Sequence, residues 1–498
     1  MKTILIVLFF MTSFFVRALR WLAVMQQKEY RFDRLLLFLY SSEGLTELFR
    51  LFPQRTDFSK SGLKRPKLTK RSLLLAAIFL VISIFYFKVI LAFGNQLLLQ
   101  WYPYPFWYNF ILLLCAWTLY LILIPVFALL SVIPTVVVAY LQTYKRLFQA
   151  NKIITQSKPT VIGITGSYGK TSTKMLLAHV LERKYSVFMT PKSYNTKYSV
   201  AHSIVTGYKT EQIALIEYAA YKKGEIKELA KWVKPGLAIV TGLTHQHVGL
   251  FGSLQEIIEA KAELVSSLPL QATAFCNTYD EQTKEICTLG SKHNKAKIVC
   301  VNPTYPKVTL TSVRVGDNAR LQFNWDGRVV HTKLIGAQYI EVVHLVIVVA
   351  LQLKMKQEEI IAALESFTPN EKFVMTFTLS NGVKVIDDGD TSNPKGFLAM
   401  VRLAKSVTVQ KKVLITPGIV DLADESQRIH SELATQSKQV FSTVVFVGES
   451  GKTEFQEVFR DKLLTTEGQL QELLSALSAQ DLIIIEGRMP AWAAKYLK

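Results

Sequence analysis

The chain has 498 residues, half of them hydrophobic, and a formal net charge of +20. This length is enough for three or four domains. Residues 1–150 hold 17 basic and 5 acidic side chains, whereas the rest of the chain holds 41 and 33. The positive excess therefore lies beside the long apolar runs of the first region, which favours a membrane with anionic lipid or lipid-linked phosphates over nucleic acid as the partner.

Long apolar runs near the N-terminus predict a membrane-anchoring region over residues 1–150. The expected spans are at about 4–24, 73–95 and 110–141. The first run ends at Arg17 and Arg20 with no small-residue cleavage site, which argues against a signal peptide and leaves a span or an interfacial helix. Lys88, near one end of the second run, is expected to snorkel to the interface.

The third run is interrupted by Pro125 and Pro134. A proline inside a helix removes a backbone hydrogen bond and kinks or breaks the helix. The run is therefore either one long kinked span or a tight re-entrant pair, so that two spans or three remain open.

Basic residues set the predicted orientation in the membrane. Residues 25–72 carry eleven Lys and Arg, whereas residues 97–109 carry none and hold interfacial Trp and Tyr. Because basic loops stay on the cytoplasmic side, 25–72 is expected to be cytoplasmic and 97–109 external. The chain is expected to return to the cytoplasm at Lys145 and Arg146. The prediction is a multi-pass protein of the inner (cytoplasmic) membrane with its later domains in the cytoplasm. Within the basic segment, Gln26–Arg50 is expected to form an amphipathic helix on the membrane surface.

The four cysteines show no metal-ligand spacing: Cys115, Cys276, Cys287 and Cys300. Cys115 falls in a predicted membrane run. The other three are expected to be reduced, buried thiols of a cytosolic domain.

A strand, a glycine-rich loop and a helix follow the membrane region in that order. Val161–Thr165 is a short β-branched run that predicts a buried strand. The loop Gly166–Thr171 comes next, and Lys174–Arg183 then has apolar residues at helical spacing. A phosphate-binding loop requires this context.

The loop reads G-x-x-G-K-T. Its glycines allow backbone N–H groups to approach phosphates, and the helix N-terminus adds positive potential. Lys170 is predicted to reach the β and γ phosphates, and Thr171 to lie beside Mg²⁺. Gly163 is one residue too far from Gly169 for the full Walker pattern, so an ordinary glycine-rich turn is the alternative.

Strands and helices alternate through residues 151–370, which predicts a doubly wound parallel sheet, an α/β fold of the P-loop ATPase kind. Glu217 lies inside an apolar strand and needs a partner, either a metal ion or a buried ion pair. His247 lies in a loop after another strand. Because ligands bind at the carboxyl ends of parallel strands, these side chains are expected to meet Lys170 in one crevice.

Shorter strands follow, with Asp326-Gly327 and Asn381-Gly382 predicted as hairpin turns. A break near Thr368–Lys372 predicts the start of a smaller, Rossmann-like final domain over residues 371–498.

Five segments of residues 158–498 together resemble the Mur ligases, ATP-dependent amide ligases of peptidoglycan synthesis, and within them the D-alanyl-D-alanine-adding branch. In chain order the segments read ITGSYGKTST, IEYAAYKKGEI, THQHVGLFGSLQEIIEAKAEL, VIDDGDTSNPKG and DLIIIEGR.

The resemblance implies roles for individual residues. Lys170, His247 and Lys261 are the implied catalytic residues, and Lys261 matches a lysine that is carbamylated in this family. The implied nucleotide contacts are Gly166, Ser167, Gly169, Lys170, Thr171, Ser172, Lys372 and Asp388. The implied metal ligands are Thr171, Glu217, His247 and Lys261. The implied substrate contacts are Asn195, Thr196, Asn393 and Pro394. Without this context, His247 is more often structural and Lys261 more often solvated.

The implied cofactors are ATP and Mg²⁺, and the implied substrates are a muropeptide and an amino acid or dipeptide. ATP phosphorylates a carboxylate, and an amine then displaces phosphate from the acyl phosphate to form an amide.

Three departures from the family pattern bear on this interpretation. The family's G-x-H-N-x-x-N segment, in which an asparagine meets the adenine, reads here Gly336 to Val342 without either asparagine. Lys372 stands where an arginine is expected. Membrane segments occupy the place of the family domain that grips the UDP of the substrate.

The missing UDP domain suggests the hypothesis that the substrate is a lipid-linked muropeptide instead of a UDP-linked one. The alternatives are a related ligase with another acceptor, or a catalytically weakened nucleotide-binding membrane scaffold.

Overall fold

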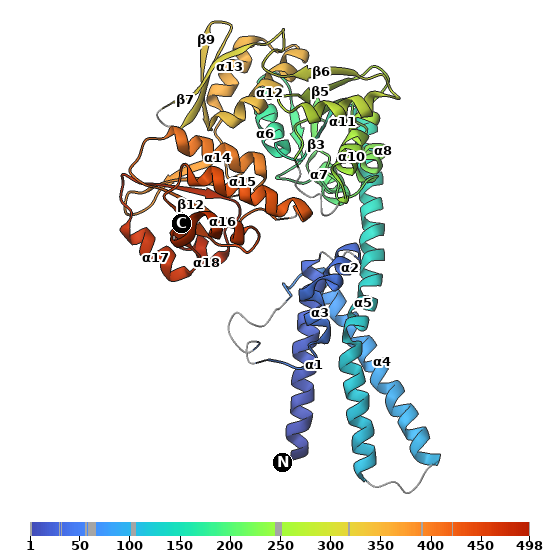
Figure 1. Cartoon of the computed structure of the whole chain (residues 1–498). Coiled ribbons are helices and arrows are strands. Elements are labelled where there is room, and N and C mark those ends of the chain that lie inside the picture. Colours follow the sequence, from blue (N-terminus) through green and yellow to red (C-terminus); the bar gives the residue numbers. More distant parts are fainter. Residues whose placement is uncertain are drawn as a thin grey trace. The chain divides into compact units, whose positions relative to one another are not determined.

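The computed structural model describes residues 2–28, 30, 32–54, 57, 66–100, 106–244, 251–316, 319–389, 392–420 and 422–497. The chain forms two compact units, Met1–Tyr144 and Lys145–Lys498, and Figure 1 shows the elements of each. Parts of the predicted cytoplasmic segment 25–72 and of the predicted external segment 97–109 lie outside the described residues.

The first unit is helical. Its helices are α1 (Lys2–Gln27), α2 (Phe32–Tyr40), α3 (Ser42–Phe49), α4 (Lys70–Gln100) and α5 (Phe106–Ser157), the last of which continues into the second unit. Pro125 and Pro134 both lie inside α5, which is therefore one long helix and not a re-entrant pair. The predicted surface helix over Gln26–Arg50 is wrong, because α2 and α3 are separate short helices. Ser41 begins α3 by accepting a hydrogen bond from the Gly44 N–H.

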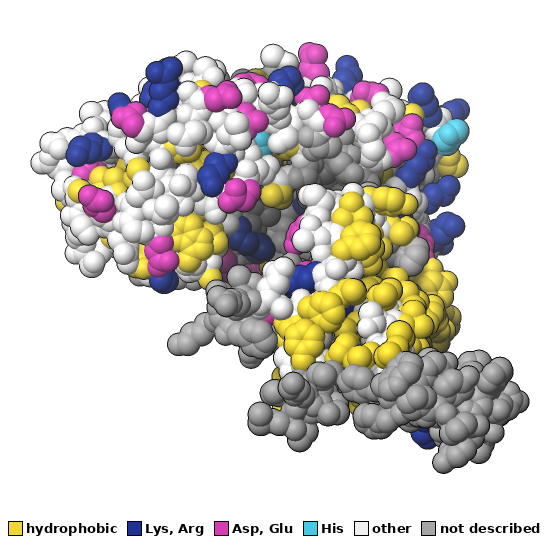
Figure 2. Space-filling view, turned by 60° about the horizontal axis from the view of Figure 1, so that its bottom comes forward, with side chains coloured by type: hydrophobic (Ala, Val, Ile, Leu, Met, Phe, Trp, Pro, Cys, Tyr) yellow, Lys and Arg dark blue, Asp and Glu magenta, His cyan; other side chains and the backbone are white. Residues whose placement is uncertain are grey.

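Within the described residues, two stretches are long and apolar enough to cross a membrane, Leu8–Gln27 and Leu114–Ser157. Figure 2 shows hydrophobic side chains crowded over the helices of this unit. On α5 the exposed ones include Leu119, Ile122, Val126, Leu130, Ile133 and Val137. These features are weak evidence for membrane association, because buried core helices and signal sequences can share the same length and composition.

Two arginines of α1 are buried inside the first unit. Arg20 forms ion pairs with Glu47 on α3 and with Asp57, whose Oδ1 lies 2.5 Å from Nη1. Arg17 donates to backbone carbonyls, including the Leu121 oxygen at 2.8 Å. A buried guanidinium requires several acceptors for its N–H groups. The contacts that both arginines make therefore hold the helices of the unit together.

The second unit contains two six-stranded sheets. The strands of the first are β1 (Thr160–Thr165), β2 (Val187–Met189), β3 (Ile213–Glu217), β4 (Leu237–Val240), β5 (Thr273–Asn277) and β6 (Lys297–Val301). Their order is β2-β3-β1-β4-β5-β6 and every pair is parallel. The predicted doubly wound parallel sheet is confirmed. β1 lies at its centre, so the loop after β1 opens at the carboxyl edge.

Helices cover both faces of this sheet (Figure 1). They are α6 (Lys170–Leu181), α7 (Lys197–Gly207), α8 (Glu225–Trp232), α10 (Leu254–Ser266), α11 (Glu281–Ser291), α12 (Ile340–Gln352) and α13 (Gln357–Ser366). α6 packs against α12, whereas α10 packs against α8 and α11. The helices and strands share one apolar core that includes Ile162, Leu176, Leu215, Ile239 and Val346.

A three-stranded antiparallel sheet precedes α12. It consists of β7 (Leu310–Val315), β8 (Arg320–Trp325) and β9 (Arg328–Ile335). Asp326 and Gly327, with φ of 48° and 80°, form the turn between β8 and β9, as the sequence predicts.

The second six-stranded sheet follows in the order β10-β11-β15-β12-β13-β14. Its strands are β10 (Met375–Thr378), β11 (Lys384–Asp388), β12 (Lys412–Thr416), β13 (Thr443–Phe446), β14 (Leu463–Leu464) and β15 (Leu482–Glu486). β10 is the antiparallel edge strand, paired with β11 through the predicted turn at Gly382. The helices here are α14 (Pro394–Ser406), α15 (Ser426–Lys438), α16 (Lys452–Phe459), α17 (Glu467–Ala476) and α18 (Ala491–Ala494).

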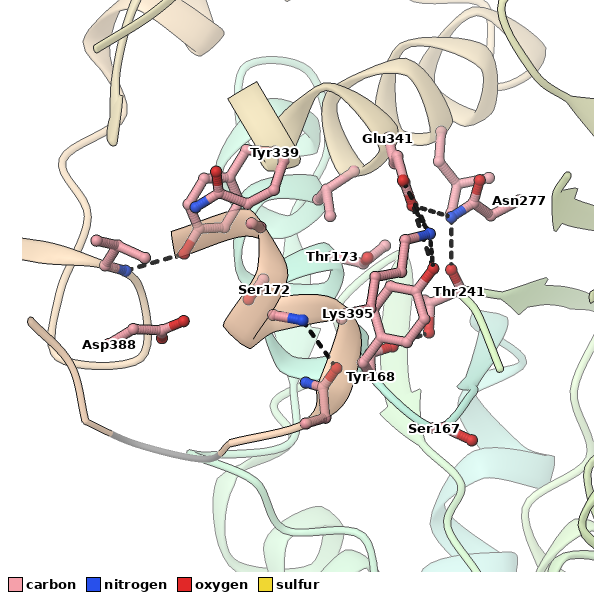
Figure 3. Close-up of a pocket in the computed structure, with 18 of the residues that line it drawn as sticks. Ser167, Tyr168, Ser172, Thr173, Thr241, Asn277, Tyr339, Glu341, Asp388 and Lys395 are labelled. Atoms are coloured by element: carbon pink, nitrogen blue, oxygen red, sulfur yellow. Dashed lines mark hydrogen bonds and ion pairs between the residues drawn. The ribbon is translucent and has the colours of Figure 1, made fainter. Parts of the chain in front are cut away.

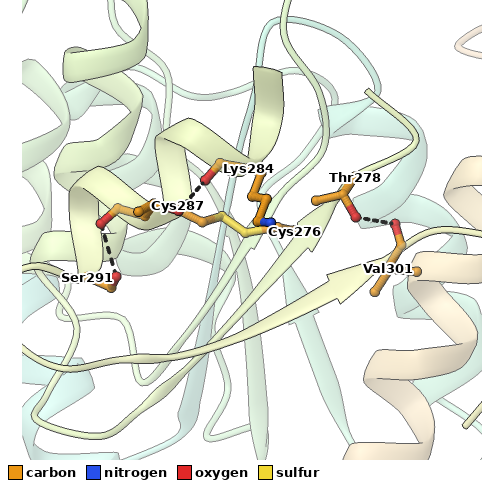
Figure 4. The surroundings of a disulfide bond; sticks show 7 residues. Cys276, Thr278, Lys284, Cys287, Ser291 and Val301 are labelled. Carbon is orange, nitrogen blue, oxygen red and sulfur yellow. Dashed lines mark hydrogen bonds between the residues drawn. A yellow bond between two sulfur atoms is a disulfide. The ribbon is translucent and has the colours of Figure 1, made fainter. Parts of the chain in front are cut away.

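A disulfide joins Cys276 at the end of β5 to Cys287 on α11 (Figure 4). The expectation that these two thiols are reduced is therefore wrong. The turn from β5 into α11 brings the two Cα atoms to 6.6 Å, within the range of a disulfide, although the residues are 11 positions apart in the chain. Cys115 and Cys300 are free, and Cys300 is half-buried where the sequence predicts a buried thiol.

Candidate active site

The loop between β1 and α6 turns through two glycines with positive φ. Gly166 has φ of +149° and Gly169, which begins α6, has φ of +74°. A Cβ atom on Gly166 would lie 2.1 Å from the Thr241 side-chain oxygen. The Ser167 N–H donates to the Gly242 carbonyl at 2.7 Å. Only glycine fits where the loop passes this close to β4, and its turn leaves the N-terminus of α6 open toward a ligand.

The next residue of the loop, Tyr168, lies with its ring against the backbone of Gly242. A Cβ atom built on Gly242 would come within 2.3 Å of two ring carbons. The Tyr168 carbonyl also accepts a hydrogen bond from the Thr241 hydroxyl. The segment after β4 therefore fixes both the backbone and the side chain of the loop.

Lys170 lies across the loop that it belongs to. Its Nζ donates to the carbonyls of Gly166 at 2.7 Å and Ser167 at 3.3 Å. Burial lowers the pKa of Lys170, and the nearby Glu217 carboxylate opposes this shift. Thr171 donates to the Ser193 hydroxyl at 3.2 Å, which ties the loop to the polar segment before α7.

Glu217, at the end of β3, is fully buried and paired with Lys174 of α6. The Lys174 Nζ lies 2.7 Å from Glu217 Oε1, and both side chains have 0% exposure. Lys174 also donates to the Lys192 carbonyl at 2.6 Å. The structure thus supplies the ion pair that was one of the two alternatives for this carboxylate.

Lys261 is placed by α10 on the inner side of that helix and is 5% exposed. Burial, and next to it the charge of Lys170, lower the pKa of Lys261 to about 7. Lys170 therefore interacts electrostatically with both Lys261 and Glu217, and the three predicted residues gather at one end of the first sheet.

The residues of this cluster suit a Mg²⁺ ion. Carboxylate and hydroxyl oxygens are the ligands that Mg²⁺ takes. Although Glu217 Oε2 is buried, it accepts no hydrogen bond in the described part of the chain, which leaves it available to a cation. His247, the other predicted ligand, belongs to residues 245–250, which lie outside the described residues.

A cavity of about 200 Å³ extends from the loop to the second sheet. Figure 3 shows Ser167 and Ser172 from the loop region and Asp388 at the end of β11 around the same space. Gly169, Lys372 and Asn393 also line it. Six predicted nucleotide or substrate residues, from segments that belong to both sheets, thus face one cavity.

Four side chains that the sequence does not point to form a network beside the loop (Figure 3). The Lys395 Nζ lies 2.9 Å from Glu341 Oε1 and 2.6 Å from the Tyr168 hydroxyl. The Asn277 amide donates to Glu341 Oε2 at 3.0 Å and to the Thr241 carbonyl at 2.7 Å. Burial, followed by the Glu341 charge, raises the pKa of Tyr168. The network connects the loop, α12 and α14.

The remaining predicted substrate residues lie at the starts of two helices. Thr196 begins α7 and accepts from the Ser199 N–H, and Asn195 precedes it in the chain and is half-buried. Pro394 is the first residue of α14, and Asn393 caps that helix by accepting from the Gly396 N–H at 3.0 Å. Asn195, Thr196 and Pro394 are not among the described residues that line the cavity.

Acidic side chains gather behind Asp388. Glu486, at the end of β15, is fully buried and accepts from the Ser392 hydroxyl at 2.9 Å. Burial, and after it the Asp388 charge, raise the pKa of Glu486 well above its usual value. A protonated Glu486 would leave Asp388 as the charged group that faces the cavity.

Sequence reasoning missed Lys174, Tyr168, Glu341 and Lys395. Lys174 follows Lys170 by one helical turn, and that spacing, together with an acidic residue in a buried strand, was a usable signal. Glu341 and Lys395 are 54 positions apart, and no local pattern connects residues at that separation.

Comparisons with known proteins agree with this arrangement. Residues 164–350 match the family model described as the Mur ligase middle domain. A UDP-N-acetylmuramoyl-tripeptide--D-alanyl-D-alanine ligase of Mycobacterium tuberculosis is 30% identical over 246 residues, which cover 48% of this chain and 48% of that protein. The chain therefore spans about half the length of this curated relative.

Two solved structures share the fold. MurF from Acinetobacter baumannii superimposes with a TM-score of 0.63 at 22% identity, over 70% of this chain and 79% of that one. MurF ligase from Thermotoga maritima, in complex with ADP, gives a TM-score of 0.61 at 22% identity, over 71% and 82%. The second unit thus has the fold of these ligases, and its residues 164–350 match the Mur ligase middle domain.

Proposed function

We propose that this protein is an ATP-dependent acid–amino acid ligase of peptidoglycan precursor synthesis. The observation that carries the proposal is the meeting of a phosphate-binding loop with a buried Lys170–Lys261–Glu217 cluster at the edge of the first sheet. Residues of the second sheet line the cavity that begins at this loop. The match of residues 164–350 and the relatives' activity support the same reaction.

The reaction has two steps. A carboxylate oxygen of the muropeptide attacks the γ-phosphorus of ATP, and ADP leaves. The amine of an amino acid or dipeptide then attacks the acyl phosphate carbon, inorganic phosphate leaves, and the amine loses a proton. D-alanyl-D-alanine is the amine that the relatives' name implies.

The chain's own residues position and stabilise the reacting groups. Backbone N–H groups of the loop and the N-terminus of α6 hold the phosphates, and Lys170 turns from the loop carbonyls toward the γ-phosphate. Thr171 and Glu217 would hold Mg²⁺, which supplies positive charge to the transferring phosphoryl group. Lys372 and Asp388 hold the nucleotide from the second sheet, while Asn393 fixes the start of α14 near the incoming amine.

Lys261 is proposed to carry a carbamate. A neutral amine is the form that adds CO₂, and a lysine with a pKa of about 7 supplies that form at neutral pH. The carbamate would place a negative charge beside Lys170, and so relieve the repulsion that lowers the pKa of Lys261.

The helices of the first unit are proposed to anchor the ligase in the cytoplasmic membrane, with the second unit in the cytoplasm where ATP is available. The disulfide opposes this placement, because such bonds are rare in reducing compartments. Reporter fusions after residue 144 and at the C-terminus decide it: cytoplasmic signal from both supports the proposed orientation, and external signal contradicts it.

A lipid-linked muropeptide is the proposed substrate, since apolar helices stand in the sequence where the family has the domain that grips UDP. Lys67, Lys70 and Arg71 precede or begin α4 and supply positive charge for a lipid pyrophosphate. UDP-linked substrate is the alternative, and equal turnover of both would argue against the lipid proposal.

The decisive test measures phosphate release by full-length protein in detergent with Mg²⁺ and bicarbonate. The panel contains UDP-linked and lipid-linked muropeptides, each with and without D-alanyl-D-alanine. Release that requires both substrates and is lost in Lys170→Ala supports the ligase. Nucleotide binding without turnover on the whole panel would favour a related ligase with another acceptor.

A second candidate, a nucleotide-binding membrane scaffold, is favoured by one observation. Tyr339 and Val342 stand where the family pattern carries asparagines. Absence of ATP binding to the folded protein would contradict the ligase and any scaffold role that requires ATP.

A further inference from the structure

A lysine that the proposed reaction does not use lies beside one of the proposed metal ligands. Lys174 of α6 is fully buried, and so is Glu217 of β3, with which it forms an ion pair. Lysine is almost never fully buried without a partner, because taking an ammonium out of water is costly unless it is paired and hydrogen-bonded. The contacts of Lys174 show what this burial achieves.

The Lys174 ammonium has one acceptor for each of its three N–H groups. Its Nζ lies 2.7 Å from Glu217 Oε1, 2.6 Å from the Lys192 carbonyl oxygen and 3.3 Å from the Thr190 hydroxyl oxygen. An ammonium carries three donors and no acceptor, so these contacts use it completely. Lys174 is therefore fixed in place, and it holds the carboxylate of Glu217 by one oxygen.

The second oxygen of Glu217 stays available for a cation. Glu217 Oε2 is buried and accepts no hydrogen bond from the residues that the structure describes. Because Oε1 is held by a fixed ammonium, the carboxylate cannot rotate freely, and Oε2 keeps one direction. Carboxylates that bind metals are commonly oriented by hydrogen-bonding partners of this kind.

The same ammonium contacts the segment that holds the other proposed oxygen ligand. Lys192 has φ of +47°, a left-handed conformation that is uncommon for residues other than glycine. Its carbonyl accepts from Lys174. The next residue, Ser193, accepts a hydrogen bond from the Thr171 hydroxyl at 3.2 Å. One buried side chain thus connects Glu217 with the segment that contacts Thr171.

Lys170, one helical turn earlier, is less suited to orient Glu217. Its Nζ donates to the carbonyls of Gly166 and Ser167 in its own loop, and the proposed reaction turns it toward the γ-phosphate. A lysine that moves to the phosphate cannot also hold the carboxylate in one direction. Lys174 keeps its three acceptors, none of which belongs to the loop.

We infer that Lys174 is a positioning residue for the divalent cation, because it holds Glu217 Oε1 and so keeps Oε2 directed at the ion. Lys174 is not among the described residues that line the cavity, so it acts through Glu217. The inference rests on the proposed function and extends it to the residue that orients a metal ligand. An ion pair with a structural role alone would stabilise the fold and leave the affinity for the cation unchanged.

Orientation and charge predict opposite effects of removing Lys174. If the main effect of its charge were to repel the cation, the cation would bind more tightly without it. If Lys174 orients Glu217, the cation binds more weakly without it, and the loss of such a partner typically weakens metal binding ten- to a hundredfold. The direction of the change therefore distinguishes the two roles.

The test measures the dissociation constant of Mn²⁺ from full-length protein in detergent with ADP. Mn²⁺ takes the same oxygen ligands as Mg²⁺, and water-proton relaxation separates Mn²⁺ on the slowly tumbling protein from Mn²⁺ on free ADP. We expect Lys174→Gln to weaken Mn²⁺ binding at least about tenfold. Lys223→Gln is the matched control, because it breaks an exposed pair with Glu259 and should leave the constant unchanged. Unchanged or tighter binding in Lys174→Gln overturns the inference.

A double variant shows whether Lys174 acts through Glu217. Glu217→Gln removes the ligand, and adding Lys174→Gln to it should change the Mn²⁺ dissociation constant by less than about twofold, because the two losses are not independent. A further tenfold loss overturns the inference. Each variant is measured below its own unfolding temperature. If Lys174→Gln alone does not fold, the comparison of Glu217→Gln with the double variant, which buries two amides and no unpaired charge, decides in its place.

The unmodified protein tests the proposed function separately. Absence of Mn²⁺ binding by the folded protein with ADP would overturn the proposed metal-dependent reaction, and this inference with it. Normal Mn²⁺ binding by the unmodified protein together with normal binding by Lys174→Gln would overturn the role of Lys174 alone.

Discussion

Two parts of the cavity wall, the loop at the proposed phosphate end and the side-chain network beside it, are built in different ways. At the proposed phosphate end, the wall is one continuous stretch, Gly166–Thr171, and Lys174 of the helix that follows is paired with the buried Glu217. Beside the loop, a network of side chains from β5, α12 and α14 joins residues more than a hundred positions apart in the chain. The difference teaches that the loop depends on its backbone conformation, which close contacts fix, whereas the network depends on the identity of its side chains.

The largest expected effect comes from the backbone of the phosphate end. Gly166→Ala would place a Cβ atom 2.1 Å from the Thr241 oxygen at a φ of +149°, and the loop would have to move. We expect at least about a hundredfold loss of phosphate release, the scale of removing one preorganised donor group.

Gly236→Ala is the control for that variant, because its nearest neighbour is an ordinary contact at 3.7 Å. Its turnover should match that of the unmodified protein. If the turnover of Gly166→Ala stays within tenfold of that of the unmodified protein, the loop does not depend on its backbone more than the side-chain network does.

The buried pair beneath the loop gives the next largest effect, on stability. Lys174→Met leaves Glu217 buried without its cation, which typically costs about 3–5 kcal/mol. Lys197→Met breaks the half-exposed pair with Glu228, 2.5 Å apart, and should cost no more than about 1 kcal/mol. Thermal unfolding of both variants measures the difference, and equal shifts would contradict it.

Lys261 makes the phosphate end sensitive to pH. Since its pKa is lowered to about 7, the neutral amine rises from about one tenth at pH 6 to nine tenths at pH 8. After CO₂ has been removed from the protein, it is added back at the same dissolved concentration at both pH values. The activity should then recover roughly tenfold faster at pH 8 than at pH 6. Lys261→Met should show no such activation. An equal rate at both pH values would argue against the carbamate.

The lowered pKa of Lys261 also makes the stability of the protein depend on pH. The unfolded chain binds more protons at Lys261 than the folded chain between pH 7 and 10.5. The contribution of this residue to stability therefore rises with pH across that window. Denaturant unfolding of the unmodified protein and of Lys261→Met at both ends of the window measures this contribution, and parallel pH profiles would contradict it.

The smallest effect is expected in the side-chain network beside the loop. A double-mutant cycle with Lys395→Met and Glu341→Gln should give a coupling of about 1 kcal/mol or less, because the Lys395 side chain is 33% exposed. Unfolding of the four proteins measures it. A coupling as large as that of a fully buried pair would show that the network stabilises the fold as strongly as the Lys174–Glu217 pair does.

The sequence was sufficient for the parts of the fold that depend on local pattern. β1, the loop and α6 are adjacent in the chain, and the alternation of strands and helices led to the parallel sheet that the structure contains. The turn at Asp326-Gly327 follows from the positive φ that its residues accept.

Contacts between segments that are distant in the chain could not be predicted from the sequence. The meeting of Tyr168, Glu341 and Lys395 depends on how α14 lies beside α12. The disulfide depends in the same way on the turn from β5 into α11. The division of Gln26–Arg50 into α2 and α3 depends on the cap at Ser41. The roles of the site residues remain predictions, and those of His247 concern a segment outside the described residues.

The contact between the Tyr168 ring and Gly242 also constrains how this protein can evolve. A side chain at position 242 would occupy the space that the Tyr168 ring fills here, so the ring would have to turn away or be replaced. A lineage that acquires a larger residue at 242 therefore also changes the conformation or the identity of residue 168.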